Sequence, residues 1–416
     1  MSPRRLDAEG LELGGGLEVL LAAALEGLAP GARLEVVSPS RSTALELHGW
    51  ARRAGHATVG ERLPAGGPYA VVVERGSTAR VLADAVGPRR APPALRDGGE
   101  FHSGDLRRDG EPPASLADAH RGFAPVGAIA ERGAPRFDWA LNERDRVWAD
   151  DVAELAEQAT RAQWDASRDV PWAAARDLPD HLERAVAQVM TFIAQNEYAA
   201  LYVPAAFLPH VNPAYAEVVM WLAGHVHDEA RHIEVFTKRA LIGGYAGQAL
   251  ASTELSLKTL LEERDFSGAA LLLNVLGEGT FLDLLAFVER HAPDAATRAA
   301  AHLAHRDEVR HVHFGISHVR RRIASDPDQR ATLVAAAERR AEKLIEMSGL
   351  SPLLSEGLTV MAAGGSMQPA ELAEGARAVR DLMQTMEDNR IKRLQAAGFD
   401  AATATHLSEL HTPNLM

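Results

Sequence analysis

The spacing of apolar residues divides the chain into three zones. From residue 143 to the end, apolar residues return every three or four positions over long stretches, which places them on one face of an α-helix. Prolines such as Pro204 and Pro293 are expected to end these helices, because proline lacks the backbone N–H that a helix needs. The pattern predicts an all-α helical bundle over 143–347 and a C-terminal helical extension over 348–416. The expected helices cover residues 143–168, 180–204, 212–240, 265–291, 293–324, 327–347 and 369–397.

The first zone, residues 1–84, mixes two kinds of short apolar run. The runs at 34–37 and 69–73 are rich in valine and have the composition of β-strands. The runs at 17–28 and 42–54 have helical spacing. This zone therefore predicts a small two-layer α/β domain, so the chain as a whole is expected to be α+β.

The zone between them, residues 85–142, is rich in proline, glycine and arginine and has no clear hydrophobic period. Such a composition is typical of a connection rather than of a packed domain. We expect a linker here, or an arm that covers the larger domain.

Composition narrows the chemistry that the chain can support. It has 416 residues and no cysteine. Disulfides, zinc ribbons, iron–sulfur clusters and cysteine nucleophiles are therefore excluded. A bound metal must be held by nitrogen and oxygen ligands from His, Asp and Glu.

The charge balance bears on partners and location. The chain has 44 Lys and Arg against 57 Asp and Glu, a net charge of −13. This works against a nucleic-acid partner, because phosphates are bound by clustered cations. The N-terminus shows no apolar signal segment, and no run approaches the roughly 18 apolar residues of a spanning helix. We expect a cytoplasmic protein with no membrane partner.

Two segments share a five-residue pattern, Asp228-Glu229-Ala230-Arg231-His232 and Asp307-Glu308-Val309-Arg310-His311. Three residues of α-helix turn the chain by about 300°, so each Glu and its His lie one turn apart on the same face and can reach one metal ion. A single Glu-x-x-His is a weak signal. Roughly 0.01 copies of Asp-Glu-x-Arg-His are expected by chance in a chain of this composition, yet two are present. The pattern indicates two metal-binding helices.

A dinuclear site in a helical bundle needs one further Glu from each of two other helices. Glu197 lies 32 residues before Glu229, and Glu278 lies 30 residues before Glu308. This spacing corresponds to one helix, a turn and part of the antiparallel return, which brings the carboxylates to similar depths. Both acids lie in apolar runs, where an unpaired carboxylate costs several kcal/mol. They are the expected remaining ligands.

Ligand chemistry favours iron. Four carboxylates offset the charge of two divalent ions, so the loaded site is near neutral. Carboxylate oxygens with two imidazoles suit iron or manganese, and the lack of thiolates argues against structural zinc. We expect two iron ions, with an iron–manganese or a dimanganese pair as alternatives.

The order Glu197, Glu229-x-x-His232, Glu278, Glu308-x-x-His311 resembles the ferritin-like di-iron carboxylate oxygenases and oxidases over residues 145–325. That group includes bacterial multicomponent monooxygenase hydroxylases, acyl-carrier-protein desaturases and p-aminobenzoate N-oxygenases. The resemblance implies a ferritin-like four-helix bundle with three ligands for each iron: Glu197, Glu229 and His232 for one, Glu278, Glu308 and His311 for the other. Glu229 and Glu308 would bridge the irons and are the expected catalytic carboxylates.

The resemblance also implies roles for the residues beside these ligands. Asp228 and Asp307 would accept hydrogen bonds from the ligand imidazoles and fix their orientation. Arg231 and Arg310 would pair with acids behind the site. The alternative for these four residues is that they are ordinary charges on the helix surface.

The chain departs from the family pattern in two places. The hydroxylases have a Thr one turn after the third Glu, where this chain has Leu282, although Thr280 is close by. The N-oxygenases add a third His four residues before the last paired Glu, where this chain has Ala304. His225 and His305 lie near the same helical face and are candidates for additional ligands, the alternative being solvent-facing histidines.

The N-terminal zone is similar to the TusA-like sulfur-carrier fold over residues 10–75. The similarity rests on the expected order of strand, helix, strand, helix and two strands. The family's Cys-Pro motif would fall near Gly14-Gly15-Gly16, where no cysteine is present. Sulfur transfer is therefore excluded, and a binding or interaction role is expected.

Together these features predict an oxidoreductase in which a di-iron centre activates O2 to hydroxylate, N-oxygenate or desaturate a small organic substrate. No Gly-x-Gly-x-x-Gly fingerprint follows a strand, so a separate reductase or ferredoxin is the expected electron donor. The family's habit predicts a homodimer through the helical face. The alternatives are a rubrerythrin-like peroxidase, disfavoured because the chain cannot bind iron through cysteine, a non-catalytic iron-storage protein, disfavoured by the additional domains, and an RNA-modifying oxygenase, disfavoured by the acidic charge.

Overall fold

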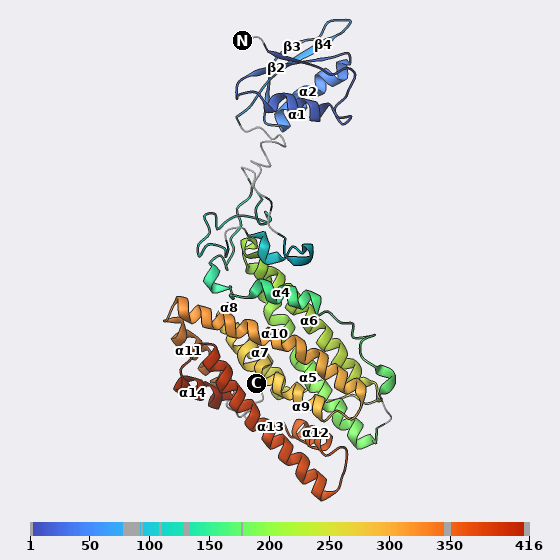
Figure 1. The fold of residues 1–416 in the computed structure, drawn as a ribbon, viewed down its shortest axis with the longest axis vertical. Helices are drawn as coiled ribbons and strands as arrows, with labels where there is room; N and C mark the ends of the chain where they lie inside the picture. The colour runs from blue at the N-terminus through green and yellow to red at the C-terminus, as the bar shows by residue number, and fades with distance from the viewer. Residues whose placement is uncertain are drawn as a thin grey trace. The chain divides into compact units, whose positions relative to one another are not determined.

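The computed structural model describes residues 3–77, 92, 95–107, 110–128, 134–175, 178–344 and 351–411. Contacts divide the chain into two compact units, Met1–Pro92 with Gly127–Gly133, and Pro93–Val126 with Ala134–Met416. The first unit contains a β-sheet with helices, and the second is predominantly helical (Figure 1). This confirms the predicted α+β class.

The N-terminal unit is a four-stranded mixed sheet with two helices. The strand order is β1-β2-β4-β3, in which β1 is parallel to β2 and the other neighbours are antiparallel. The order of elements along the chain is the one expected from the sequence. The elements are β1 (Arg4–Asp7), α1 (Leu17–Glu26), β2 (Arg33–Ser38), α2 (Arg41–Arg53), β3 (Ala57–Arg62) and β4 (Tyr69–Glu74).

Alternating apolar residues on the two central strands build the core of this unit. Leu34 lies opposite Val73, and Val36 lies opposite Val71, so the four side chains share one face of the sheet. All four are buried in one cluster with apolar residues of α1 and α2. Burial on a single face explains why both helices lie against that face.

The helical unit contains a bundle made of two helix pairs. Helix α5 packs along α6, and α10 packs along α9 and the π-helical segment η7. One hydrophobic cluster runs through these helices. The helices of the unit are α4 (Val152–Arg161), α5 (Asp180–Phe207), α6 (Ala216–Leu241), α7 (Ala251–Leu261), α8 (Phe266–Ala270), η7 (Leu271–Glu278), α9 (Gly279–Arg290), α10 (Ala295–Ser325), α11 (Gln329–Leu344), α12 (Pro352–Ala362), α13 (Pro369–Ala396) and α14 (Ala401–His411).

The observed helices differ from the expected ones in three respects. Pro204 lies inside α5, so the expected helix end at this residue is wrong. A proline near the end of a helix costs one N–H bond and leaves the preceding turns intact. The helix expected over 143–168 is confined to α4. Residues 143–151 contain only the 3₁₀ turn Arg144–Arg146, and in residues 162–168 the Asp165 carboxylate accepts the backbone N–H groups of Ser167 and Arg168 in a turn. Helices α7, α12 and α14 were not among the expected helices. Each has 11 residues, too few turns to show a clear hydrophobic period.

One helix runs from Phe266 to Arg290 and changes type along its length. Helix α8 leads into a π-helix over Leu271–Glu278, and α9 continues from Gly279. A π-turn changes the direction of the side chains that follow it and often occurs at functional sites. By length and composition this helix could also span a membrane, but 83% of its most apolar window is buried inside the protein. It is therefore a buried core helix of the bundle.

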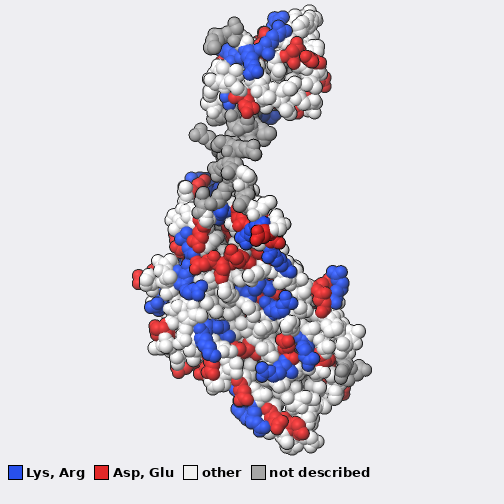
Figure 2. All heavy atoms as spheres, in the orientation of Figure 1, with Lys and Arg blue, Asp and Glu red and all other residues white. Residues whose placement is uncertain are grey.

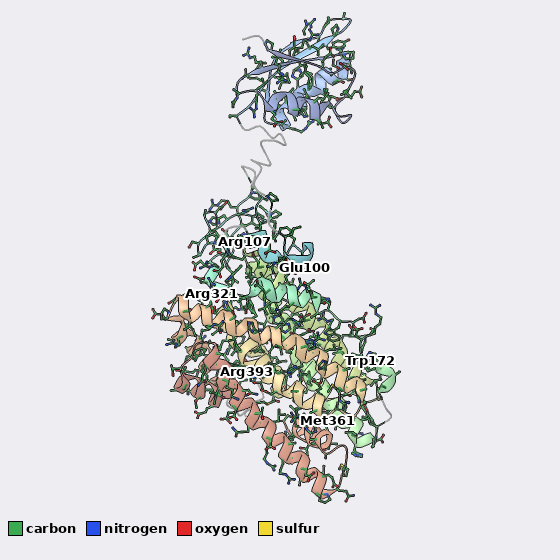
Figure 3. All side chains as sticks on the ribbon, in the orientation of Figure 1. Glu100, Arg107, Trp172, Arg321, Met361 and Arg393 are labelled. Atoms are coloured by element: carbon green, nitrogen blue, oxygen red, sulfur yellow. The ribbon has the colours of Figure 1, made fainter. Side chains whose placement is uncertain are left out.

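Part of the expected connecting segment lies against the helical unit. Arg107 Nε lies 2.5 Å from Glu217 Oε1 on α6, and Arg321 Nη2 of α10 lies 2.9 Å from Glu111 Oε2. Figure 3 labels Arg107 and Arg321 on the helical unit. Acidic and basic side chains are interspersed over the visible face of the unit (Figure 2). These contacts hold part of the segment 95–128 onto the bundle.

Candidate metal centre

The six ligands predicted from the sequence come together in the interior of the bundle. They lie on α5, α6, η7 and α10, and each is at most 4% exposed to solvent. The four helix segments therefore contribute carboxylates and imidazoles to a single buried volume. The residues are Glu197, Glu229, His232, Glu278, Glu308 and His311.

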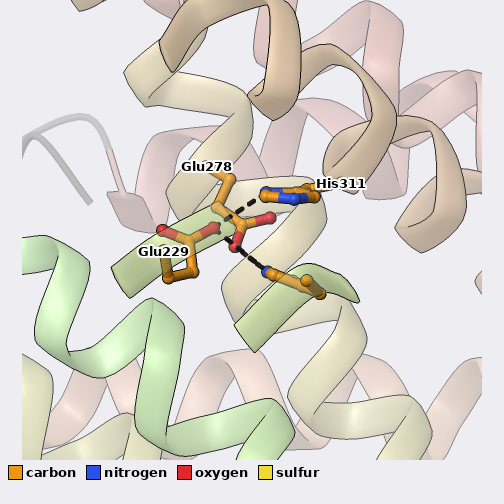
Figure 4. Close-up of side chains that lie close together, drawn as sticks. Glu229, Glu278 and His311 are labelled. Atoms are coloured by element: carbon orange, nitrogen blue, oxygen red, sulfur yellow. Dashed lines mark hydrogen bonds and ion pairs between the residues drawn. The ribbon is translucent and has the colours of Figure 1, made fainter. Parts of the chain in front are cut away.

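These side chains form two groups with the geometry of metal sites. Within each group the potential ligand atoms all lie within 4.8 Å of one another. Glu229 belongs to both groups, and Figure 4 shows it beside Glu278 and paired with His311. One group is Glu197, Glu229, His232 and Glu308, and the other is His225, Glu229, Glu278 and His311.

The two paired glutamates lie between the two imidazoles. His311 Nδ1 is 2.8 Å from Glu229 Oε1, and His232 Nδ1 is 3.2 Å from Glu229 Oε2. Glu308 repeats this arrangement, with Oε1 at 3.2 Å from His232 Nδ1 and Oε2 at 3.4 Å from His311 Nδ1. Each carboxylate thus directs one oxygen toward each histidine, which is the geometry of a bridging ligand.

The other nitrogen of each imidazole faces an aspartate. His232 Nε2 lies 3.3 Å from Asp307 Oδ2, and His311 Nε2 lies 3.3 Å from Asp228 Oδ2. The aspartate of each motif therefore serves the histidine of the other motif. A carboxylate accepts hydrogen bonds, so it keeps a proton on Nε2 and directs Nδ1 toward the glutamates, where Nδ1 could bind a metal that displaces its own proton.

Two arginines tie the aspartates to each other. Arg231 Nη2 lies 2.5 Å from Asp228 Oδ1 and 2.9 Å from Asp307 Oδ2. Arg310 Nη2 donates to Asp307 and lies 3.3 Å from Asp228 Oδ2. Each guanidinium thus spans α6 and α10. The pairing fixes both aspartates behind the imidazoles.

Two residues behind the site were not predictable from the motif. The indole N–H of Trp164 donates to Asp307 Oδ2 over 2.7 Å, and the Gln163 side-chain amide donates to Asp228 Oδ1 over 3.3 Å. The Arg231 guanidinium lies over the Trp164 ring, 5.0 Å from its centre. Both residues follow α4 in an irregular segment, where helical spacing gives no signal.

His225 joins the second group, whereas His305 joins neither group. His225 Nε2 lies 3.1 Å from Glu278 Oε1 and 3.3 Å from Glu229 Oε1. Its ring stacks on His311 with the ring centres 3.8 Å apart. His305 is half-buried on α10 and lies outside both groups. His225 lies four residues, or about one helical turn, before Glu229 on α6, so its side chain points toward the same site.

Burial and mutual charge shift the titration of these groups. Burial raises the pKa of Glu197 well above its ordinary value, and the negative charges of Glu229 and Glu308 raise it further. Burial also opposes ionisation of Glu229, but the imidazoles of His232 and His311 outweigh it and hold its pKa well below the ordinary value. Burial lowers the pKa of each histidine, yet the Glu229 carboxylate raises both pKa values well above the usual range. The metal-free cluster therefore holds protons that a metal would displace.

The cluster fits a pair of cations. Glu197 Oε1 has no hydrogen-bond partner. Glu229 Oε1, both Glu308 carboxylate oxygens and His311 Nδ1 lie at ion-pair distances from neighbouring ligand atoms but lack hydrogen-bond geometry. A buried polar atom without a partner costs about 1–3 kcal/mol, and more when it is charged. Carboxylate oxygens and imidazole nitrogens are ligands for iron and manganese. A metal pair would satisfy these atoms together.

Comparison with known proteins gives a distant likeness. No protein-family model matches the chain, and no curated protein matches it. A variant of an R2-like ligand-binding oxidase with a Mn/Fe cofactor has a TM-score of 0.46 and 19% identity, over 58% of this chain and 92% of that chain. Another variant, with an Fe/Fe cofactor, has a TM-score of 0.46 and 18% identity over the same shares. At this level of similarity, those cofactors say nothing about the metal of this chain.

Proposed function

We propose that the chain is a di-metal oxidoreductase that activates O2 to oxidise a small organic substrate. The observation that carries this proposal is the sharing of Glu229 by two buried groups of ligand-type side chains. Paired Glu-x-x-His helices with two further glutamates are the ligand set of di-iron bundles. When bound, a pair of irons, or an iron–manganese or dimanganese pair, would supply electrons to O2 and stabilise the negative charge that develops on oxygen.

The two groups would give each metal four ligands, and Glu308 would add a fifth to the second metal. The first would be held by Glu197, Glu229, His232 and Glu308, and the second by His225, Glu229, Glu278 and His311. Glu308 would be a second bridge, because its oxygens lie 3.2 Å and 3.4 Å from the two histidine Nδ1 atoms. This assignment adds His225 to the predicted ligands and makes the second site richer in nitrogen.

The residues behind the ligands would keep the histidines ready to bind. Asp228 and Asp307 hold the protons on the Nε2 atoms, and the two arginines hold the aspartates. Because these charges pair with each other in a buried volume, the imidazoles cannot rotate without breaking ion pairs. Ligands fixed in this way would keep their positions when the charge of the bound metals changes during a redox reaction.

A narrow cavity supports a role for a small apolar reactant. It has a volume of about 20 Å³, and its walls are apolar except at His225 and Asn274. That volume admits one molecule of the size of water or O2, and apolar walls favour O2 over water. The cavity is lined by Val203, Phe207, Leu222, Ala270, Leu273 and Phe314, among others.

The proposed reaction needs electrons and a substrate from outside the bundle. We infer a separate reductase or ferredoxin as the donor and a small organic molecule as the substrate. The N-terminal unit, which has no cysteine for sulfur transfer, is proposed to bind one of these partners. The chain is also proposed to form a homodimer and to act in the cytoplasm.

Metal loading tests the assignment. Anaerobic addition of ferrous iron followed by desalting should leave about two irons per chain, and the double variant Glu229→Ala/Glu308→Ala should bind none. Glu234→Ala on the same helix is the control, because Glu234 is exposed and pairs with Lys238. Undiminished iron in the double variant would refute the site.

Oxygen consumption then tests the activity. Loaded protein given a reductant should consume O2 over repeated turnovers and should retain its two irons. Accumulation of a ferric mineral with many irons per chain would assign storage instead. Consumption of hydrogen peroxide without any requirement for O2 would assign a peroxidase.

A further inference from the structure

A second cavity, with a volume of about 430 Å³, lies in the helical unit. Its walls come from α5, from residues 245–248, from α12 and from Met367. None of its lining residues belongs to the two metal groups. The volume falls within the range of pockets that bind small molecules. The cavity therefore has the size of a separate binding site.

Close packing against α5 fixes the walls of this cavity. A Cβ on Gly247 would lie 2.4 Å from the nearest α5 side-chain atom, and a Cβ on Gly357 of α12 would lie 3.0 Å from another. The side-chain amide of Gln188 donates to the Gln248 carbonyl over 3.0 Å and accepts the Gln248 N–H over 2.9 Å. These contacts hold residues 245–248 and α12 on α5, so a ligand would meet walls that are already in place.

An arginine is held in position at the cavity. The guanidinium of Arg184, on α5, lies over the Tyr245 ring, 5.0 Å from its centre, and both residues line the cavity. A contact of this kind orients the guanidinium and leaves its N–H groups available to an acceptor. Among the described residues, no carboxylate pairs with Arg184.

A carboxylate on another wall also lacks a partner. Glu356, on α12, lines the same cavity, yet it forms no ion pair with Arg184 or with any other residue of the described ranges. Opposite charges of this chain do pair where their side chains meet, as Lys343 and Glu262 do over 2.6 Å. Arg184 and Glu356 are therefore a separated cation and anion at one cavity.

The rest of the lining offers mainly apolar surface. His181 donates to the Gly365 carbonyl, and the Gln188 amide is bonded to the backbone of residue 248. Leu353 is 40% exposed and Met367 is 58% exposed, so both side chains present apolar area that a ligand could cover. The cavity thus combines one cation, one anion and an apolar surface.

We propose that this cavity binds a small zwitterion, an α-amino acid with an apolar side chain. The ligand carboxylate would accept from Arg184, because the fork of guanidinium N–H groups matches the two oxygens of a carboxylate. The ligand ammonium would donate to Glu356, and the ligand side chain would cover Leu353 and Met367. A simple anion or a simple cation would leave one of the two charges without a partner. The proposal does not depend on the oxidoreductase function, because no residue is shared with the metal groups.

Isothermal titration calorimetry of the full-length protein with L-leucine tests the proposal. Leucine should bind saturably, and metal-loaded and metal-free protein should bind it equally. Isocaproate, which lacks the ammonium, and isoamylamine, which lacks the carboxylate, should each bind at least about tenfold more weakly. The absence of saturable leucine binding, or equal affinity for leucine and either analogue, would overturn the proposal. Binding of leucine to the metal-loaded protein alone would place it on the metal and would also overturn the proposal.

Two variants identify the residues by the ligand that each one affects, and both positions are exposed, so neither substitution opens the core. Arg184→Met should weaken leucine binding at least about tenfold and leave the weak binding of isoamylamine unchanged, because isoamylamine has no carboxylate. Glu356→Gln should weaken leucine binding and leave that of isocaproate unchanged. Arg168→Met is the control, because Arg168 is exposed, pairs with Asp165 over 2.8 Å and does not line the cavity. Wild-type leucine affinity in Arg184→Met or in Glu356→Gln, or an equal loss in Arg168→Met, would contradict the site.

Discussion

Asp307 on α10 lies 3.3 Å from Nε2 of His232 on α6, so the aspartate of one motif orients the histidine of the other. Asp228 and His311 repeat the relationship in the opposite direction at the same distance. The two Glu-x-x-His segments are therefore coupled through their flanking acids. A substitution in one motif should therefore weaken the binding of the metal that the other motif would hold.

Asp307→Ala should weaken ferrous iron binding about 10–100-fold, because His232 loses the acceptor that fixes its tautomer and Arg231 loses an anionic partner. Asp307→Asn keeps an oxygen acceptor for the imidazole and should recover part of the affinity. The measurement is an anaerobic titration against a competing chelator. Asp283→Ala is the control, since Asp283 pairs with Arg393 on α13. Wild-type affinity in Asp307→Ala would show that the aspartate does not position a ligand.

His225→Phe should weaken the binding of one of the two metals, because only the Glu278 group contains His225. Phenylalanine preserves the stacking on His311 and removes the ligand nitrogen. We expect about one tightly bound iron per chain after a chelator wash that leaves two in the wild type. His305→Phe is the matched control and should keep both irons, because His305 lies outside the two groups. Equal metal content in the wild type and His225→Phe would exclude His225 as a ligand.

Gly315→Ala should shift the Glu278 carboxylate, although Gly315 is not itself a member of the ligand group. A Cβ at residue 315 would lie 2.4 Å from the Asn274 Cβ, and Asn274 Nδ2 donates to Glu278 Oε2 over 2.6 Å. Relief of this clash should cost about 1–3 kcal/mol of unfolding free energy and should displace Glu278. Gly224→Ala is the control, because its Cβ would lie at 3.8 Å from the Ala159 Cβ. Urea unfolding and metal content measure both effects. Identical values for the two variants would show that the contact is not tight.

Acid should destabilise the protein partly through His318. This residue is buried, its Nδ1 donates to the Trp148 carbonyl, and its Nε2 accepts from Ser267. Burial lowers its pKa to about 4 from 6.5. Below pH 6.5 the unfolded chain therefore binds a proton that the folded chain does not, and stability falls by roughly 3 kcal/mol between pH 6.5 and pH 4.

His318→Gln removes this titration. The unfolding free energy of the metal-free variant should fall less than that of the wild type between pH 7 and pH 5, by about 2 kcal/mol. Metal-free protein is used for both chains so that metal release does not add to the change. Parallel pH profiles would mean that His318 is not buried in its neutral form.

Much of the bundle was predictable because it depends on sequence patterns between residues close together in the chain. Helices such as α5, α6 and α10 repeat apolar residues over many turns, and the Glu-x-x-His spacing acts within a single turn. The prediction that Glu197 and Glu278 meet these motifs needed only antiparallel helices of similar length. The structure brings these side chains together, whereas their binding of metal stays a prediction.

The contributions that the sequence did not reveal are those that depend on tertiary contacts. Trp164 and Gln163 reach the aspartates from an irregular segment. The sequence made both His225 and His305 candidate ligands. Only the structure shows that the His225 side chain reaches the site and that the His305 side chain does not. Glu278 is the last residue of a π-helix, which changes the direction of its side chain relative to a regular α-helix, and no residue pattern of regular helices encodes such a change.

The central claim is that Glu229 serves two metal sites, whereas Glu278 serves one. Iron content after anaerobic loading and a chelator wash tests it most directly, with Glu229→Ala, Glu278→Ala and the wild type compared in parallel. The account predicts about two irons per chain in the wild type, about one in Glu278→Ala and fewer than 0.2 in Glu229→Ala. Equal iron content in the two variants, or two irons in Glu229→Ala, would contradict a shared carboxylate.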